Sequence, residues 1–85
     1  MEKSIYSKEY SLFIEELRKA REEKGLTQTE VAERLGRTQS FVSKVERSER
    51  RIDVVEVRAF CSAIGISFPE FIRSIDKIFD DKRGK

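Results

Sequence analysis

The sequence predicts an all-α domain of five helices. Apolar residues recur at helical spacing in five successive segments, and capping residues or glycines separate these segments. No segment alternates apolar and polar residues with a period of two for long enough to indicate a sheet. A chain of 85 residues holds one domain with a small core, and it contains no internal repeat or linker. We therefore expect residues 1–85 to form a single domain, with a core over about residues 8–79 and frayed tails.

The first helix is expected from about residue 8 to residue 24. Glu, Lys and Arg occupy one face of this segment, and Gly25 stands in the position of a helix C-cap. The opposite face is apolar and consists of Tyr10, Phe13, Ile14, Leu17 and Ala20.

Two short helices are expected next, joined across Gly36. Thr27 and Glu30 form a capping box that starts the first of them. Thr38 is the N-cap candidate of the second, which ends before the basic loop 47–51. Their inward residues are Val31, Ala32 and Leu35 in the first, and Phe41, Val42 and Val45 in the second.

Two further helices begin with the same signal. Asp53 and Glu56 form one capping box, Ser67 and Glu70 form another, and the polar tail 80–85 is expected to fray. The apolar residues at helical spacing are Val57, Phe60, Cys61 and Ile64 in the fourth helix, and Phe68, Phe71, Ile72, Ile75, Ile78 and Phe79 in the fifth.

The composition argues against an enzyme. Histidine is absent, which removes the commonest general base and metal ligand, and we expect no catalytic residues, metal or cofactor. Cys61 is the only cysteine, and we expect it to be a small buried hydrophobe rather than a redox sensor. The sequence lacks a membrane-spanning stretch and a signal-peptide core, so the expectation is a cytoplasmic protein without membrane association.

Positive charge gathers in one part of the chain. The formal net charge is only +2, which by itself does not indicate nucleic acid. Residues 37–51, however, hold five basic and two acidic residues, a net charge of +3. The basic side chains of this segment can neutralise DNA phosphates. They are Arg37, Lys44, Arg47, Arg50 and Arg51.

The outward face of the third predicted helix is polar without being highly charged, and it carries Gln39, Ser40, Ser43 and Lys44. Two helices joined across a glycine are typical of a helix-turn-helix, whose second helix enters the DNA major groove. Gln39 can pair with adenine N6 and N7, and Lys44 can reach guanine O6 and N7. Alternatively, such residues only cap and solvate a short surface helix. The neighbouring basic residues favour DNA reading.

The stretch GLTQTEVAERLGRTQSFVSKVERSERR, followed by VRAFCSAIGIS, resembles the helix-turn-helix family of lambda-type phage repressors and Cro, often named the XRE family. The similarity covers about residues 12–71. It implies a compact lambda-repressor-like bundle in which the second and third helices form the helix-turn-helix. It also implies binding to double-stranded operator DNA, usually as a dimer.

The resemblance implies roles for single residues. Gln28 would contact a phosphate and brace Gln39. Glu46 matches an acidic position that pairs with a basic residue of the first helix, and the spacing makes Arg21 its expected structural partner. The base-facing positions are Gln39, Ser40 and Lys44, and the groove-edge positions are Arg37, Thr38 and Ser43.

Two residues depart from the family pattern. Ser48 stands where glycine is common, so the exit of the third helix is expected to lack its usual left-handed cap. Arg37 replaces a small or apolar residue and adds a cation beside the groove, for backbone contact or base reading. Phe41 is expected to pack beneath the third helix rather than to touch a thymine methyl.

The fifth helix carries more apolar surface than a core of this size needs. These residues either close the core or extend beyond it into a two-fold interface, which we expect at Ile75, Ile78 and Phe79. The sequence thus favours a sequence-specific transcriptional regulator, most simply a repressor, that binds a palindromic operator as a homodimer. The alternative is a protein-interaction module, such as an antitoxin or a partner-dependent regulator, with weak DNA binding of its own.

Overall fold

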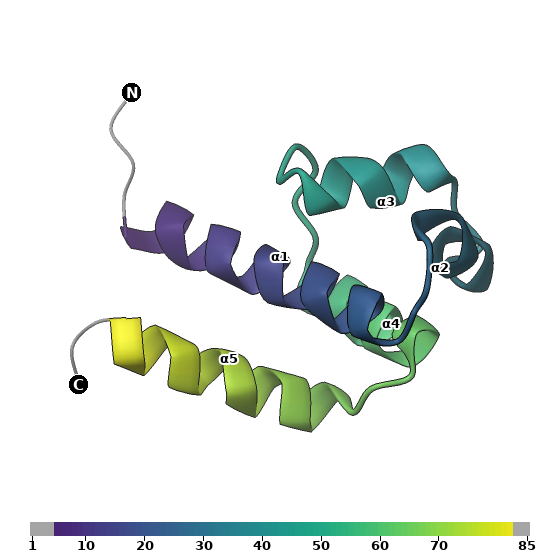
Figure 1. Ribbon diagram of the computed structural model, residues 1–85. Helices are drawn as coiled ribbons and strands as arrows, with labels where there is room; N and C mark the ends of the chain where they lie inside the picture. Colours follow the sequence, from purple (N-terminus) through teal and green to yellow (C-terminus); the bar gives the residue numbers. More distant parts are fainter. Residues whose placement is uncertain (1–4, 83–85) are drawn as a thin grey trace.

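The computed structural model describes residues 5–82, and within them the chain forms five α-helices and no strand (Figure 1). In chain order these are α1 (Ile5–Glu23), α2 (Gln28–Leu35), α3 (Gln39–Glu46), α4 (Val54–Ile64) and α5 (Phe68–Lys82). The predicted all-α class is confirmed, and each expected helix is present.

Two helix boundaries differ from the prediction. α1 begins at Ile5 rather than near residue 8, and α5 continues through Lys82 instead of fraying from Asp80. No glycine or proline stands between Asp80 and Lys82, and polar side chains on a solvent-facing side do not end a helix. The other residues expected to fray, 1–4 and 83–85, lie outside the described residues.

The long helices α1 and α5 lie side by side and run in opposite directions, with α3 on the other side of α1 (Figure 1). α2 contacts both α3 and α4, and α4 also contacts α5. All five helices contribute to one core, which consists of Ile14, Leu17, Val31, Ala32, Val42, Val45, Val57, Phe60, Cys61, Ala63, Ile64, Phe71 and Ile75. Because α3 is held from both α1 and α2, its position is set by the core.

Reciprocal hydrogen bonds start α2 and α4. Thr27 Oγ1 accepts from the N–H of Glu30 at 3.1 Å, and the Glu30 carboxylate accepts from the N–H of Thr27 at 2.8 Å. The second bond holds the pKa of Glu30 below its ordinary value. Asp53 and Glu56 make the same pair of bonds at the start of α4. Two of the three capping boxes that the sequence predicted are thus confirmed, and at the third the N–H of Glu70 donates to Ser67 Oγ at 3.3 Å.

Ser48 corrects one expectation about the exit of α3. Its φ is 62°, so the left-handed turn is present although glycine is not. The N–H of Ser48 donates to the carbonyl of Val45 at 3.0 Å, and the N–H of Glu49 donates to that of Lys44 at 2.8 Å. These two bonds satisfy carbonyls at the end of the helix. They hold the serine in a backbone conformation that residues other than glycine rarely adopt.

Ile75 also corrects an expectation. It was expected at a two-fold interface with Ile78 and Phe79, but it is only 6% exposed because it faces the core one helical turn after Phe71. Ile78 and Phe79 are half-buried. The exposed large apolar residues of the described chain are instead Val54, Val55 and Ile72.

Cys61 lies in the core, as predicted. Burial raises the pKa of its thiol to about 11, so the thiol is protonated at neutral pH and is a poor nucleophile. Among residues 5–82, no helix has the length and apolar content needed to cross a membrane.

Replacing Ser48 with glycine is expected to stabilise the fold by about 0.5–1 kcal/mol, because glycine takes the left-handed conformation without strain. Urea unfolding followed by circular dichroism measures this change. Ser62→Gly makes the same chemical change at an exposed helical position of α4 and should destabilise by about 0.5 kcal/mol. A loss of stability in Ser48→Gly would contradict the assigned strain.

Candidate nucleic-acid interface

A tight turn joins α2 to α3. Gly36 adopts a φ of 70°, and the N–H of Arg37 donates to the carbonyl of Ala32 at 2.9 Å, which closes α2. Thr38 then caps α3, since its Oγ1 accepts from the N–H of Phe41 at 3.1 Å. The turn leaves the N-terminal end of α3 open to solvent, which is the end that enters the major groove in helix-turn-helix proteins.

The two sides of α3 have opposite chemistry. Val42 and Val45 are fully buried and fix the helix to the core. Of the predicted base-facing residues, Gln39, Ser40 and Lys44 are exposed, whereas Ser43 is half-buried. The exposed side offers an amide, a hydroxyl and an ammonium group, which can match the donors and acceptors on base edges.

A buried ion pair joins α1 to the end of α3. Arg21 Nε donates to Glu46 Oε2 at 2.6 Å, and its Nη2 donates to Oε1 at 3.0 Å. The side chains are only 11% and 5% exposed. Arg21 Nη1 also donates to the carbonyl of Leu26 at 2.6 Å. The hydrogen bonds to Glu46 raise the pKa of Arg21, although burial opposes this, so the guanidinium stays charged.

Two glutamines extend this ion pair to the surface. Gln28 Nε2 donates to Glu46 Oε1 at 2.9 Å, and Gln39 Nε2 donates to Gln28 Oε1 at 2.7 Å. The chain of hydrogen bonds therefore runs from α1 through α3 and α2 to the exposed start of α3. The Gln28–Gln39 bond that the family resemblance implied is present in the structure.

Two of the four predicted phosphate-binding or groove-edge arginines form ion pairs within the protein. Arg47 pairs with Glu49 at 3.0 Å, which raises the pKa of Arg47 and lowers that of Glu49. Arg50 pairs with Glu56 at 3.0 Å and so is tied to the cap of α4. The positive charge near α3 is therefore more compensated than the sequence indicated. Lys44 makes no ion pair within residues 5–82.

Three arginine guanidinium groups in this region lie over aromatic rings. The Arg37 guanidinium lies 3.8 Å from the ring centre of Phe41, and that of Arg50 lies 5.2 Å from the same ring. Phe41 is half-buried and packs on Phe60, in line with the predicted packing role. Arg51 lies over Tyr10 at 4.2 Å.

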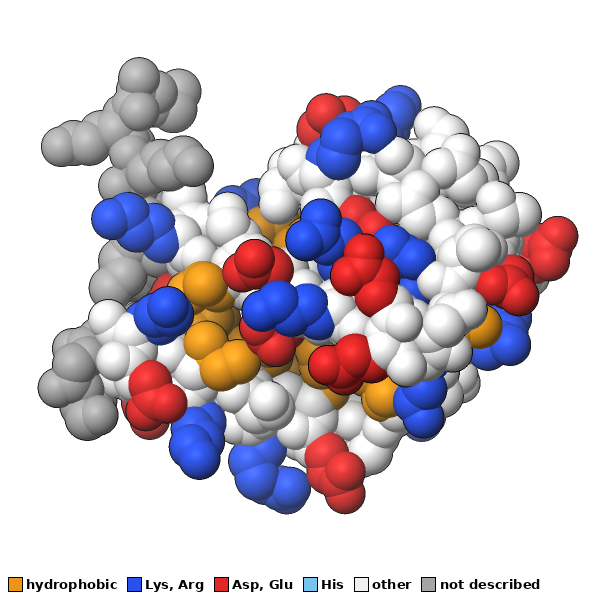
Figure 2. Space-filling model, viewed as in Figure 1, with side chains coloured by type: hydrophobic (Ala, Val, Ile, Leu, Met, Phe, Trp, Pro, Cys, Tyr) orange, Lys and Arg blue, Asp and Glu red, His pale blue; other side chains and the backbone are white. Residues whose placement is uncertain are grey.

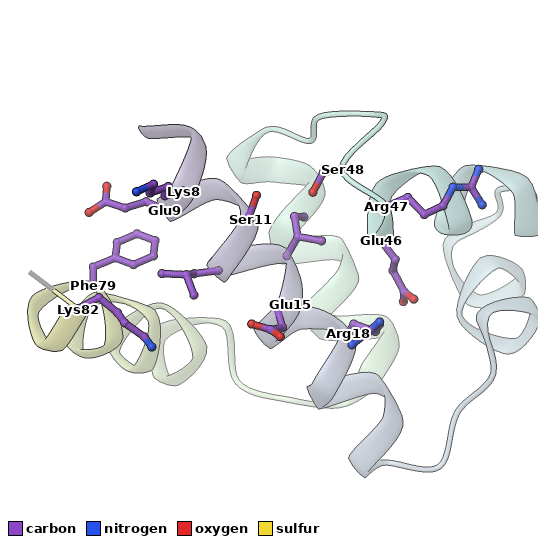
Figure 3. A pocket seen from close by; sticks show the side chains of 12 residues that line it. Lys8, Glu9, Ser11, Glu15, Arg18, Glu46, Arg47, Ser48, Phe79 and Lys82 are labelled. Atoms are coloured by element: carbon purple, nitrogen blue, oxygen red, sulfur yellow. The ribbon is translucent and has the colours of Figure 1, made fainter. Parts of the chain in front are cut away.

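A groove elsewhere on the surface carries charges of both signs. It lies between α1, the end of α5 and the exit of α3, and Figure 3 shows Phe79 and Lys82 at one end and Glu46 and Arg47 at the other. Figure 2 likewise shows basic and acidic side chains intermixed on the visible face. Within the described residues, no group of three or more His, Cys, Asp or Glu side chains is placed to hold a metal ion.

Comparison with known proteins identifies the family to which this fold belongs. The helix-turn-helix family model matches residues 17–71, more than half of the chain. The solved structure of an XRE-family like protein from Pseudomonas syringae pv. tomato str. DC3000 superposes with a TM-score of 0.84 at 42% sequence identity. The match covers 87% of this chain and 90% of that one. The chain belongs to the XRE family of helix-turn-helix proteins.

Two further relatives agree with this assignment. The restriction-modification controller protein C.AhdI from Aeromonas hydrophila matches the XRE domain with a TM-score of 0.66 and 32% identity, over 73% of this chain and 90% of that one. A protein of Sinorhizobium fredii (strain NBRC 101917 / NGR234), named as the uncharacterized HTH-type transcriptional regulator y4dJ, is 39% identical over 57 residues. These cover 67% of this chain and 74% of the relative. XRE proteins are DNA-binding transcriptional regulators, which is not an enzyme class.

Arg21→Ala is expected to destabilise this XRE domain by about 3 kcal/mol, because it leaves the carboxylate of Glu46 buried without its charge partner. Thermal and urea unfolding measure the loss. Arg18→Ala is the matched control on the same helix, since Arg18 makes only an exposed 4.0 Å pair with Glu22 and should cost about 0.5 kcal/mol or less. Equal losses in the two variants would show that the buried pair is not important for stability.

Proposed function

We propose that this protein is a cytoplasmic, sequence-specific transcriptional repressor that binds a palindromic DNA operator as a homodimer. The observation that carries the proposal is the open face of α3, whose polar side chains are held outward by the buried Val42 and Val45. Polar groups on a rigid helix are suited to reading base edges, because the backbone that carries them does not have to be ordered on binding. A dimer bound across a promoter excludes other proteins from it.

The roles of the surrounding residues follow from their places on the helix-turn-helix. Gln39 reads adenine, Lys44 reads guanine, and Ser40 and Ser43 supply hydroxyls to the same edge. Phosphate and groove-edge contacts come from Gln28, Arg37, Thr38, Arg47, Arg50 and Arg51. The stacking of Arg37 on Phe41 supports its role, since a pre-ordered guanidinium loses less side-chain freedom when it meets DNA.

An exposed apolar surface supports the homodimer. Val54 and Val55 are 65% and 72% exposed at the start of α4, directly after the basic loop. Val54 lines a shallow groove with Ile72 and Phe79 of α5. We propose that this surface, rather than one centred on Ile75, covers the same surface of a second copy, which would place two α3 helices on one DNA face.

One experiment tests the whole proposal: selection and sequencing of random duplex DNA bound by the purified protein at physiological salt. A two-fold symmetric motif would support both base reading and dimeric binding, and it would supply the operator sequence. If the folded protein enriches no motif, the proposal is wrong.

The second candidate is a partner-dependent module with weak DNA binding of its own, such as an antitoxin. It is favoured by the pairing of Arg47 with Glu49 and of Arg50 with Glu56, which reduces the positive charge available to phosphates. The two candidates differ in salt dependence, since neutralising several phosphates makes affinity fall steeply as salt rises. A shallow salt dependence of DNA binding would favour the second candidate.

Gln39→Ala is expected to weaken binding to the selected operator by about 1–3 kcal/mol and to relax preference at one base pair of each half-site. Lys44→Ala should do the same at another base pair. Arg51→Ala is the control, because the loss of a phosphate contact weakens all sequences alike. Fluorescence anisotropy with cognate and scrambled duplexes measures the affinity of each variant and its sequence preference. Equal losses on the two duplexes for Gln39→Ala would exclude base reading by this residue.

Val54→Asp is expected to convert the dimer to a monomer, with a dimer dissociation constant raised at least about tenfold by the buried charge. The substitution itself is compatible with the fold, since an acidic residue is favourable at the start of a helix. Sedimentation velocity at micromolar concentration measures the change. Ser74→Asp is the control, because it adds the same charge to α5 outside this groove and should leave the dimer intact. If both variants dissociate equally, the interface lies elsewhere.

A further inference from the structure

Tyr10 of α1 contacts the end of the basic loop at two points. Its hydroxyl oxygen accepts a hydrogen bond from the backbone N–H of Ile52 at 3.1 Å, across 42 residues of sequence. Its ring lies beside the guanidinium of Arg51, whose central carbon is 4.2 Å from the ring centre. Ile52 and Arg51 are neighbours in the chain. One side chain of α1 therefore holds both the backbone and a basic side chain at the end of this loop.

The ring of Tyr10 is itself held by other aromatic rings. Tyr10 is half-buried and packs against the core. Its ring meets that of Phe13 edge to face, with 5.5 Å between the ring centres, which is a favoured arrangement of two aromatic side chains. Phe13 in turn lies 6.2 Å from Phe71 of α5. Because the ring is fixed on the core, it is a rigid support for an exposed side chain.

Arg51 differs in its contacts from the other two arginines of the loop. Arg47 and Arg50 each pair with a glutamate of the protein. Arg51 is exposed, and its side chain makes no ion pair and no hydrogen bond within residues 5–82. An aromatic ring contacts the face of a guanidinium, whereas the N–H donors lie in the guanidinium plane. The contact with Tyr10 therefore orders Arg51 and leaves its donors available.

We propose that Tyr10 is a positioning residue for binding of the DNA backbone: its hydroxyl places the loop, and its ring orients Arg51 toward a phosphate. The inference rests on the phosphate contact of Arg51 in the proposed function and adds a residue of α1 that itself touches no DNA. A free arginine loses side-chain freedom when it binds, whereas an arginine that is already stacked has less freedom to lose. α1 thereby contributes to affinity without changing which bases are read.

Tyr10→Leu tests the proposal, because leucine keeps an apolar side chain for packing but has neither ring nor hydroxyl. Fluorescence anisotropy with the selected operator and with a scrambled duplex measures the two dissociation constants. We expect Tyr10→Leu to raise both by about two- to fivefold and to leave their ratio unchanged. Tyr10→Phe keeps the ring and should retain most of the wild-type affinity. If Tyr10→Phe loses as much affinity as Tyr10→Leu, the ring does not position Arg51.

The decisive measurement is the same substitution in an Arg51→Ala background. There Tyr10→Leu should weaken binding no further, because the ring has no guanidinium left to orient. Phe13→Leu is the matched control: it removes another half-buried ring from α1, and Phe13 contacts no cation within the described residues. Its effect should be the same with and without Arg51. A loss from Tyr10→Leu that persists in full without Arg51 would overturn the proposal, since it would come from the fold alone.

A second readout needs no DNA. In ¹⁵N–¹H spectra of the free protein, the Nε–H signal of Arg51 should be displaced by the ring of Tyr10, return toward the ordinary arginine position in Tyr10→Leu, and stay displaced in Phe13→Leu. An undisplaced wild-type signal would overturn the positioning role. DNA binding without coupling between Tyr10 and Arg51 would overturn this inference alone. A wild-type protein that binds no duplex would overturn the proposed function as well, so the two failures are distinguishable.

Discussion

The buried ion pair between Arg21 and Glu46 is the constraint on which the rest of the interface depends. A carboxylate that is 5% exposed is stable only beside a partner that neutralises it and satisfies its lone pairs. Arg21 does both, and its third hydrogen bond, to the carbonyl of Leu26, holds the segment that leads into α2. One guanidinium therefore ties α1 to the start of α2 and to the end of α3, so the α2–α3 unit cannot shift relative to the core without exposing a charge.

The size of the domain explains why α3 has two such different sides. A chain of this length buries only a small core, and each short helix must contribute to it. α3 does so with Val42 and Val45, while α2 contributes Val31 and Ala32. Hydrogen-bonded caps at Thr27 and Thr38 supply the remaining stability of helices too short to form alone. The outer side of α3 is thereby left free of structural demands and available for polar groups.

The surroundings of the cationic side chains near α3 also bear on DNA binding. Arg47 and Arg50 are paired with glutamates, and Arg37 and Arg51 lie over aromatic rings, so part of the positive charge near α3 is compensated within the protein. Such a surface attracts DNA in general only moderately, because nonspecific binding depends on the number of phosphates that are neutralised. Under the proposed function, discrimination then comes mainly from the polar groups on the exposed side of α3.

The sequence by itself determined the local features of this protein. Helix number, the capping boxes at Thr27 and Asp53, and the core positions depend on residues within a turn or two of each other, so periodicity and capping chemistry reveal them. Family resemblance added the expected helix-turn-helix. Only the tertiary structure showed the left-handed Ser48, the burial of Ile75 and the pairing of Arg50 with Glu56. The burial of Ile75 and the pairing of Arg50 with Glu56 depend on where separate elements meet, because an apolar residue is buried only if another helix covers it. The turn at Ser48 is held by local hydrogen bonds, but the residue type that usually marks such a turn, glycine, is absent from it.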